Sequence, residues 1–95
     1  MPSSKRLPKG LSINPMEGKI VYRLYDTDIV TIDTRLNGFT LNTGGHYTNH
    51  TKKCMNIALL PFGFNVTQKQ GQWSIDKVDQ DNYRPLNYYD GITIY

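Results

Sequence analysis

The chain has 95 residues, of which 38% are hydrophobic, 20% charged and 12% aromatic. This length predicts one small domain and excludes a multidomain machine, while the apolar and aromatic content suffices for a compact core and argues against wholesale disorder. A net charge of +3 is too small to indicate a dedicated polyanion binder. The charge is uneven: +2 over residues 1–18, +3 over residues 19–70 and −2 over residues 71–95.

Cys54 is the only cysteine in the chain, so an internal disulfide is impossible and a reducing compartment is expected. Because a short chain without covalent staples needs other support, we expect a homo-oligomer, in which the acidic last segment could meet the basic body of another copy. No apolar run approaches the length of a membrane span, and the N-terminus lacks the apolar stretch of a signal peptide. Neither secretion nor a membrane partner is therefore expected.

Residues 1–18 are rich in proline, glycine and serine, and their apolar residues follow no clear period. This composition predicts a flexible basic arm, followed by a single domain over residues 19–95.

The domain is expected to begin with a three-stranded meander. Apolar and aromatic residues alternate over residues 19–25, which is the period of a strand, and β-branched residues follow over 29–33. The polar residues 26–28 predict the turn between these two strands. A second turn is expected at 36–38, where Asn-Gly tolerates positive φ angles, before a third strand over 39–42.

A short helix is expected next. Thr48 or Asn49 can cap it, apolar residues recur at three- and four-residue spacing up to Leu59, and Pro61 and Gly63 end it.

Two apolar runs, at Phe64 and Val66 and at Trp73 and Ile75, predict a hairpin around Gln70-Gly71. Residues 76–85 are polar and turn-rich, and residues 86–95 predict either a terminal hairpin or one strand at a sheet edge. The whole pattern indicates the α+β class: an antiparallel sheet made of the meander, the hairpin and a terminal strand, with the helix packed on one face.

The strongest candidate site runs from a strand through a double glycine into the start of the helix. Successive N–H groups of such a turn, with the positive end of a helix, can bind an anion, and hydroxyls and lysines follow. The candidate phosphate-binding residues are Thr43, Gly44, Gly45, His46, Thr48, Thr51, Lys52 and Lys53. The same residues are also explained as a plain bend, helix caps and solvated lysines.

Aromatic and basic residues alternate elsewhere in a way that suits base stacking with neutralisation of the nucleic-acid backbone. The candidate nucleic-acid contacts are Arg23, Arg35 and Tyr47. Ordinary packing on a half-buried sheet explains the same residues without a ligand, and we prefer that interpretation because the aromatic strand motifs of RNA-recognition domains are absent.

No catalytic residue, cofactor or metal is predicted. His46, His50 and Cys54 are spaced four apart, as zinc ligands on one helix face could be, but a buried thiol with two surface histidines explains them better. Asp26 and Asp28 are the side chains that a turn prefers. No nucleophile elbow and no activated cysteine motif occurs, so an enzyme is not expected.

Three motifs carry a resemblance: Tyr-Asp-Thr-Asp-Ile-Val at residues 25–30, Leu-Asn-Thr-Gly-Gly-His at 41–46 and Thr-Lys-Lys-Cys-Met-Asn at 51–56. With them, the region of about residues 19–75 resembles small uncharacterised proteins of tailed bacteriophages. The resemblance implies a viral accessory or host-interaction gene whose product acts in the host cytoplasm. This chain differs from that group in one respect. The stretch after the double glycine is richer in arginine in the group than in this chain.

We therefore expect a small, non-catalytic phage protein that binds a host macromolecule, of the host-takeover or anti-defence type, with residues 43–53 as the contact. The alternative hypothesis is a binder of nucleotides or nucleic acid that uses the same segment for phosphate. A third hypothesis is a virion structural or assembly protein.

Overall fold

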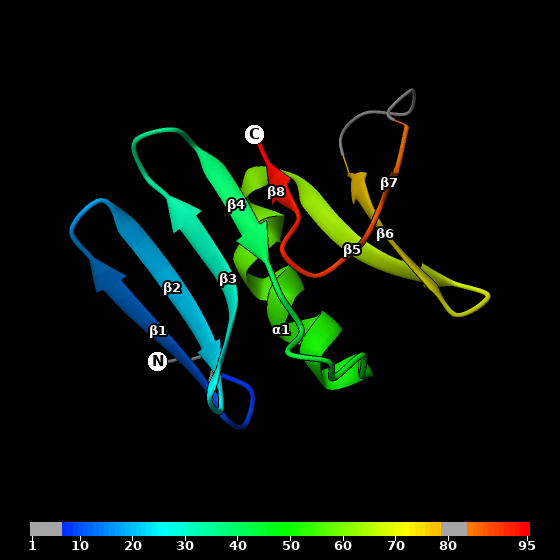
Figure 1. Ribbon diagram of the computed structural model, residues 1–95, viewed down its shortest axis with the longest axis horizontal. Coiled ribbons are helices and arrows are strands. Elements are labelled where there is room, and N and C mark those ends of the chain that lie inside the picture. The colour runs from blue at the N-terminus through cyan, green and yellow to red at the C-terminus, as the bar shows by residue number, and fades with distance from the viewer. Residues whose placement is uncertain (1–6, 79–83) are drawn as a thin grey trace, which may run out of the picture.

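The computed structural model describes residues 7–78 and 84–95, so part of the predicted arm and part of the predicted polar segment 76–85 lie outside the described residues. In chain order the elements are β1 (Leu11–Met16), β2 (Lys19–Leu24), β3 (Thr27–Asp33), β4 (Gly38–Leu41), α1 (Asn49–Leu59), the 3-10 turn η1 (Leu60–Phe62), β5 (Phe64–Lys69), β6 (Gln72–Lys77), β7 (Leu86–Asn87) and β8 (Thr93–Ile94) (Figure 1).

The strands form two antiparallel sheets. The larger sheet has the order β1-β2-β3-β4-β8, and the smaller sheet has the order β5-β6-β7. Figure 1 shows the two sheets side by side, with α1 behind and between them. The α+β class with antiparallel strands and one short helix is thereby confirmed, although the strands are divided between two sheets where the sequence predicts one.

The first four strands form the meander, which has one strand more than predicted. Residues 11–16, assigned to a flexible arm by the sequence, form β1 and pair with β2 from Leu11 opposite Leu24 to Met16 opposite Lys19. The arm prediction is wrong for these residues. Only Leu11 of β1 is buried, whereas Ile13 and Met16 are exposed, and Pro15 is compatible with an edge position.

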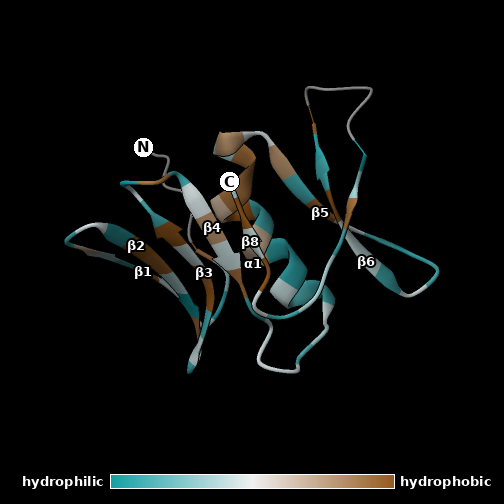
Figure 2. Cartoon of the chain, turned by 45° about the horizontal axis from the view of Figure 1, so that its top comes forward, coloured by the Kyte–Doolittle hydropathy of each residue, from teal (hydrophilic) through white to brown (hydrophobic). Residues whose placement is uncertain are grey.

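The main core lies between the larger sheet and α1. Alternating residues of β3 and β4, such as Val30, Ile32 and Leu41, are buried against Met55 and Leu59 of the helix. Figure 2 shows hydrophobic residues along β2 and β3 and around the C-terminal end of α1.

The opposite face of the larger sheet carries a row of threonines, because successive side chains of a strand point to opposite faces. Thr31, Thr40 and Thr93 lie next to one another across β3, β4 and β8. The hydroxyl oxygens of Thr40 and Thr93 are 3.1 Å apart.

The helix is capped as the sequence predicts and is tied to the smaller sheet. Thr48 is the N-cap, and its Oγ1 accepts the N–H of Thr51 at 3.2 Å. After η1 the chain leaves the helix through Gly63, whose φ is 84°. The Asn56 side chain bonds both backbone groups of Val66: Oδ1 accepts the Val66 N–H at 2.6 Å, and Nδ2 donates to the Val66 carbonyl at 3.1 Å.

The C-terminal segment connects the two sheets. β7 pairs with β6 of the predicted hairpin, whereas β8 pairs with β4, where Phe39 lies opposite Ile94. The expectation of a strand at a sheet edge therefore describes β8, and the alternative of a terminal hairpin is wrong because β7 and β8 belong to different sheets. This crossing brings residues 88–92 next to the segment between β4 and α1.

Candidate functional site

The segment from Thr43 to Lys53 connects β4 to α1, as predicted. Gly44 and Gly45 both have positive φ angles, 65° and 87°. A side chain at Gly44 would also clash, because a Cβ there would lie 2.7 Å from Oγ1 of Thr27. Glycine at position 44 is therefore required by both the backbone conformation and the contact with β3.

A carboxylate of the chain itself occupies the donors at this turn. The N–H of Thr43 donates to Oδ1 of Asp90 at 2.8 Å, and the Thr43 hydroxyl lies 2.9 Å from both carboxylate oxygens. The Tyr88 hydroxyl donates to the same Oδ1 at 2.8 Å. Thr43, Tyr88 and Asp90 form what we call the Asp90 network, which ties the C-terminal segment to the end of β4.

The two glycine N–H groups have partners as well. The Gly44 N–H donates to Oδ1 of Asn42 at 2.7 Å, and the Gly45 N–H donates to Oγ1 of Thr43 at 3.1 Å. The turn thus has the donors that the sequence predicts, but its anion is Asp90. An external phosphate would have to displace that carboxylate.

The Asp90 network shifts the pKa values of its members. Partial desolvation raises the pKa of the Asp90 carboxyl, but the hydrogen bonds from Thr43 and Tyr88, together with the nearby Gly45 N–H, outweigh it and hold the pKa below its usual value. Burial raises the pKa of the Tyr88 hydroxyl, and its bond to Asp90 raises it further. In this network the Asp90 carboxylate is therefore a charged acceptor, and the hydroxyls of Thr43 and Tyr88 are neutral donors.

This shift predicts how stability depends on pH. Because the pKa of Asp90 is lower in the folded chain than in the unfolded chain, its contribution is fully present above the unfolded value of about 3.9 and is lost as the pH falls through the folded value. Urea unfolding of the wild type and Asp90→Asn should give a constant difference in unfolding free energy above about pH 5 and a shrinking difference below about pH 4. A difference that stays constant down to the acid end would contradict this assignment.

Several residues of the predicted phosphate site line a pocket of about 290 Å³ between the β2–β3 turn and the start of α1. Its lining residues are Leu24, Tyr25, Asp26, Thr27, Ile29, Thr43, His46, Thr48, His50 and Thr51. Lys52 and Lys53 are not among them. The structure therefore brings the threonines and histidines of the predicted phosphate site together but places both lysines elsewhere.

Lys52 extends toward the smaller sheet. Its Nζ donates to Oε1 of Gln68 at 3.2 Å and lies 5.9 Å from the centre of the Trp73 ring. Lys53 is exposed and lies beside the buried Cys54, whose pKa burial raises. Neither lysine complements the glycine turn as the phosphate hypothesis requires.

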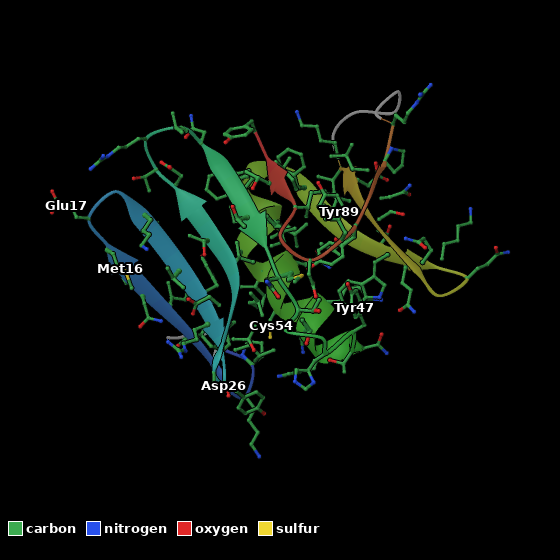
Figure 3. All side chains as sticks on the ribbon, in the orientation of Figure 1. Met16, Glu17, Asp26, Tyr47, Cys54 and Tyr89 are labelled. Atoms are coloured by element: carbon green, nitrogen blue, oxygen red, sulfur yellow. The ribbon has the colours of Figure 1, made fainter. Side chains whose placement is uncertain are left out.

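Tyr47 belongs to an aromatic cluster that the sequence does not reveal. Its ring makes edge-to-face contacts with Trp73, at 5.1 Å between centroids, and with Tyr88, at 5.9 Å. Trp73 and Tyr88 are in turn 5.6 Å apart. Trp73 and Tyr88 are buried, whereas Tyr47 remains 51% exposed. We call Tyr47, Trp73, Tyr88 and Lys52 the aromatic patch. Figure 3 labels Tyr47 beside the start of α1.

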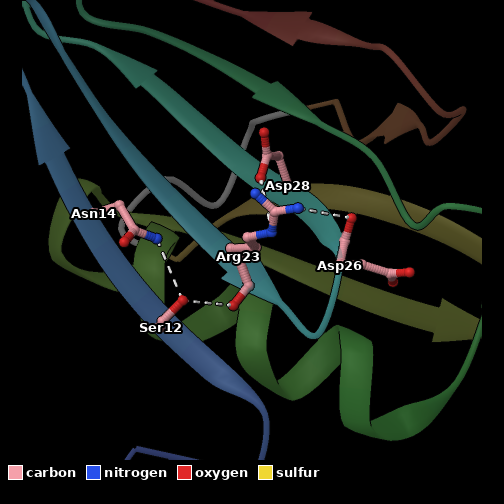
Figure 4. A network of polar contacts seen from close by, with 5 residues as sticks. All are labelled: Ser12, Asn14, Arg23, Asp26 and Asp28. Atoms are coloured by element: carbon pink, nitrogen blue, oxygen red, sulfur yellow. Dashed lines mark hydrogen bonds and ion pairs between the residues drawn. The ribbon is translucent and has the colours of Figure 1, made fainter.

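Arg23 and Arg35, the other candidate nucleic-acid contacts, do not converge with Tyr47. Arg23 pairs with Asp28 at 3.8 Å on the exposed end of β2, where its guanidinium also meets the Asp26 carbonyl at 3.5 Å (Figure 4). Arg35 lies in the β3–β4 turn, at the other end of β3, beside Gly18. The three predicted contacts thus do not form one surface.

The residues considered as metal ligands make other contacts in the structure. Nε2 of His50 lies 2.8 Å from the carbonyl oxygen of Lys9, and Cys54 is completely buried. Within residues 7–78 and 84–95, no three His, Cys, Asp or Glu side chains are grouped so that they could hold a metal ion.

Sequence reasoning misses Asp90, Tyr88 and Trp73 as members of the site. Asp90-Gly91 resembles any turn and Trp73 any buried strand residue, and 47 positions separate Thr43 from Asp90. No local pattern identifies such a contact. The only signal is that the net charge changes from positive to negative along the chain, since an acidic last segment can supply the anion that a donor-rich turn binds.

The fold and the site define a small α+β protein with a glycine turn whose donors are engaged within the chain, a pocket beside the start of α1, and an aromatic patch of which Tyr47 is exposed. A family model described as Kyanoviridae Gp96 protein matches residues 10–95, so the chain belongs to this family of phage proteins. The match includes β1, which agrees with its place in the sheet. No curated protein and no solved structure matches the chain. None of the helices in the described part is long and apolar enough to cross a membrane.

Proposed function

We propose that this phage protein is a non-catalytic accessory protein that binds a host protein in the host cytoplasm through the aromatic patch. The observation that carries the proposal is Tyr47: half of its side chain is exposed, while Trp73 and Tyr88 hold its ring. An exposed tyrosine whose ring already packs against its neighbours loses little conformational entropy on binding, and tyrosine is a common centre of protein interfaces.

The engaged donors beside the aromatic patch also favour a protein partner over phosphate. The N–H groups of Thr43, Gly44 and Gly45 have acceptors within the chain, and Asp90 places a negative charge at the glycine turn. A phosphate at this position would meet that charge. A protein surface that covers Tyr47 meets no such penalty.

A second candidate function is binding of single-stranded nucleic acid, because the Lys52 ammonium lies over the Trp73 ring beside the exposed Tyr47. Stacking on Tyr47 with a lysine near the backbone is a known mode of such binding. Salt separates the two functions, since neutralised phosphates make affinity fall steeply with salt and an aromatic protein contact does not.

Tyr47→Ala is expected to abolish capture of the partner while leaving the fold intact. An interface tyrosine of this kind contributes about 2 kcal/mol, or roughly 30-fold in the dissociation constant. The test is affinity capture from host lysate, with and without nuclease, using the wild type, Tyr47→Ala and the control Tyr95→Ala. Tyr95 is 78% exposed and lies over Gly38, away from the aromatic patch.

The proposal predicts one host protein that the wild type and Tyr95→Ala capture and Tyr47→Ala does not, with no effect of nuclease. Loss of capture with nuclease would support the nucleic-acid function instead. Equal capture by Tyr47→Ala would reject the aromatic patch. The homo-oligomer stays a prediction, which light scattering of the purified protein tests against the chain mass of 10.9 kDa.

A further inference from the structure

The pocket beside the start of α1 lies outside the aromatic patch, since none of Tyr47, Trp73, Tyr88 and Lys52 lines it. We propose that this pocket binds an uncharged nucleobase or nucleoside through the donor edge of the base. The inference goes beyond the proposed function, because it concerns a different surface and a small molecule.

The floor of the pocket offers mainly apolar groups to a ligand. Leu24 and Ile29 are buried, and so are Thr43 and Thr51, at 1% and 2% exposed. Both threonine hydroxyls already have hydrogen-bond partners. The Thr43 hydroxyl bonds to the Asp90 carboxylate, and the Thr51 hydroxyl lies 3.1 Å from the Thr48 hydroxyl. Methyl groups and aliphatic side chains therefore remain for a ligand, and they suit the face of a flat ring.

The rim is held in place by contacts with the chain that precedes β1. Tyr25 has a φ of 55°, which is unfavourable for a bulky residue, and its N–H donates to the Gly10 carbonyl at 2.8 Å. The Tyr25 ring lies so close to Gly10 that a Cβ there would be 2.6 Å from it. Strained residues of this kind are found at binding sites, where the surroundings fix them.

The rim is rich in acceptors. A carbonyl oxygen can only accept, so the contact between His50 and the Lys9 carbonyl assigns the proton to Nε2. In the neutral ring, Nδ1 of His50 is then an acceptor, and Asp26, which also lines the pocket, carries two further acceptor oxygens on its carboxylate. The hydroxyl of Thr27 and the ring of His46 can donate or accept.

The ligand class follows from these features. Among the residues that the structure describes, no lysine or arginine lines the pocket, and the one ionised side chain there, Asp26, is negative, so a phosphate is disfavoured. A volume of about 290 Å³ lies at the lower limit of about 300 Å³ for drug-sized ligands and suits a base or a nucleoside. Flat rings with N–H donors on one edge match an apolar floor with an acceptor-rich rim.

The test is an NMR titration of the full-length ¹⁵N-labelled chain with adenosine, guanosine, cytidine, uridine and their 5′-monophosphates. We expect at least one nucleoside to cause saturable shifts at the amides of residues 25–27 and 46–51, with the monophosphate binding no more tightly. Asp26→Asn should weaken this binding about tenfold, because a charged acceptor is lost. The matched control is Asp28→Asn, since Asp28 pairs with Arg23 and does not line the pocket.

Three results would overturn the proposal: no saturable shift with any nucleoside, binding that is tenfold tighter with the monophosphate, or equal affinity of Asp26→Asn and the wild type. The amide spectra themselves report whether each variant is folded. The capture experiment on Tyr47 is independent of this titration, so either proposal can fail without the other.

Discussion

Trp73→Ala is expected to lower the free energy of unfolding by about 3–5 kcal/mol, the cost of removing a large aromatic side chain from a core. Trp73 is only 3% exposed, and its ring contacts Tyr47 and Tyr88. Domains of this size are stable by about 5–15 kcal/mol, so the loss is a large fraction of the total. Urea unfolding followed by circular dichroism measures it.

The control for Trp73→Ala is Tyr95→Ala, which removes an aromatic ring that is 78% exposed and should cost less than about 0.5 kcal/mol. Trp73→Phe should recover most of the loss because a ring remains between Tyr47 and Tyr88. If Trp73→Ala cost less than about 1 kcal/mol, the packing assigned to this side chain would be wrong.

Asp90→Ala is expected to cost about 1–2 kcal/mol, because the buried Thr43 loses its acceptor and hydrogen bonds to a charged group contribute about 1.5–3 kcal/mol before the exposure of Asp90 is allowed for. Part of the carboxylate is exposed, which keeps the value below that of a fully buried network. The same substitution should loosen the C-terminal segment, since Gly91 bonds to Leu41 next to it at 2.7 Å. Hydrogen exchange at Ile92 and Ile94 would report that loosening.

Asp28→Asn is the matched control for Asp90→Ala. Asp28 is paired only through a 3.8 Å contact with Arg23, and both side chains are about half exposed, so its removal should cost less than about 0.5 kcal/mol. Equal losses for Asp90→Ala and Asp28→Asn would mean that the Asp90 network does not stabilise the fold.

The local elements of the fold can be predicted from the sequence because their signals are local. The alternation over β2 and the Thr48 cap place a strand and a helix where the structure has them. β1 escapes prediction because it is short, contains Pro15 and lies between Gly10 and Gly18, a composition that is typical of a linker. The division into two sheets escapes it as well, since β7 and β8 are two residues each and only tertiary contacts decide which sheet each one joins.

The sequence could predict where the candidate site lies, but it could not predict which groups are in contact there. The glycine turn is donor-rich, as expected, but the sequence cannot show that Asp90, far along the chain, accepts from Thr43. Nor can it show that Lys52 extends to Gln68 or that Tyr47 packs on Trp73. These contacts weigh against the alternative hypothesis of phosphate at the glycine turn, and they move the proposed contact of the leading hypothesis, a host macromolecule, to the aromatic patch.

The most direct test of the aromatic patch is the dissociation constant between this protein and the captured host protein, measured at about 50 mM and about 200 mM salt. We predict a value roughly 30-fold higher for Tyr47→Ala than for the wild type at both salt concentrations, an unchanged value for Tyr95→Ala, and little effect of salt on the wild type. An unchanged value for Tyr47→Ala, or a fall in affinity of about 10³-fold between the two salt concentrations, would contradict a protein interface at Tyr47.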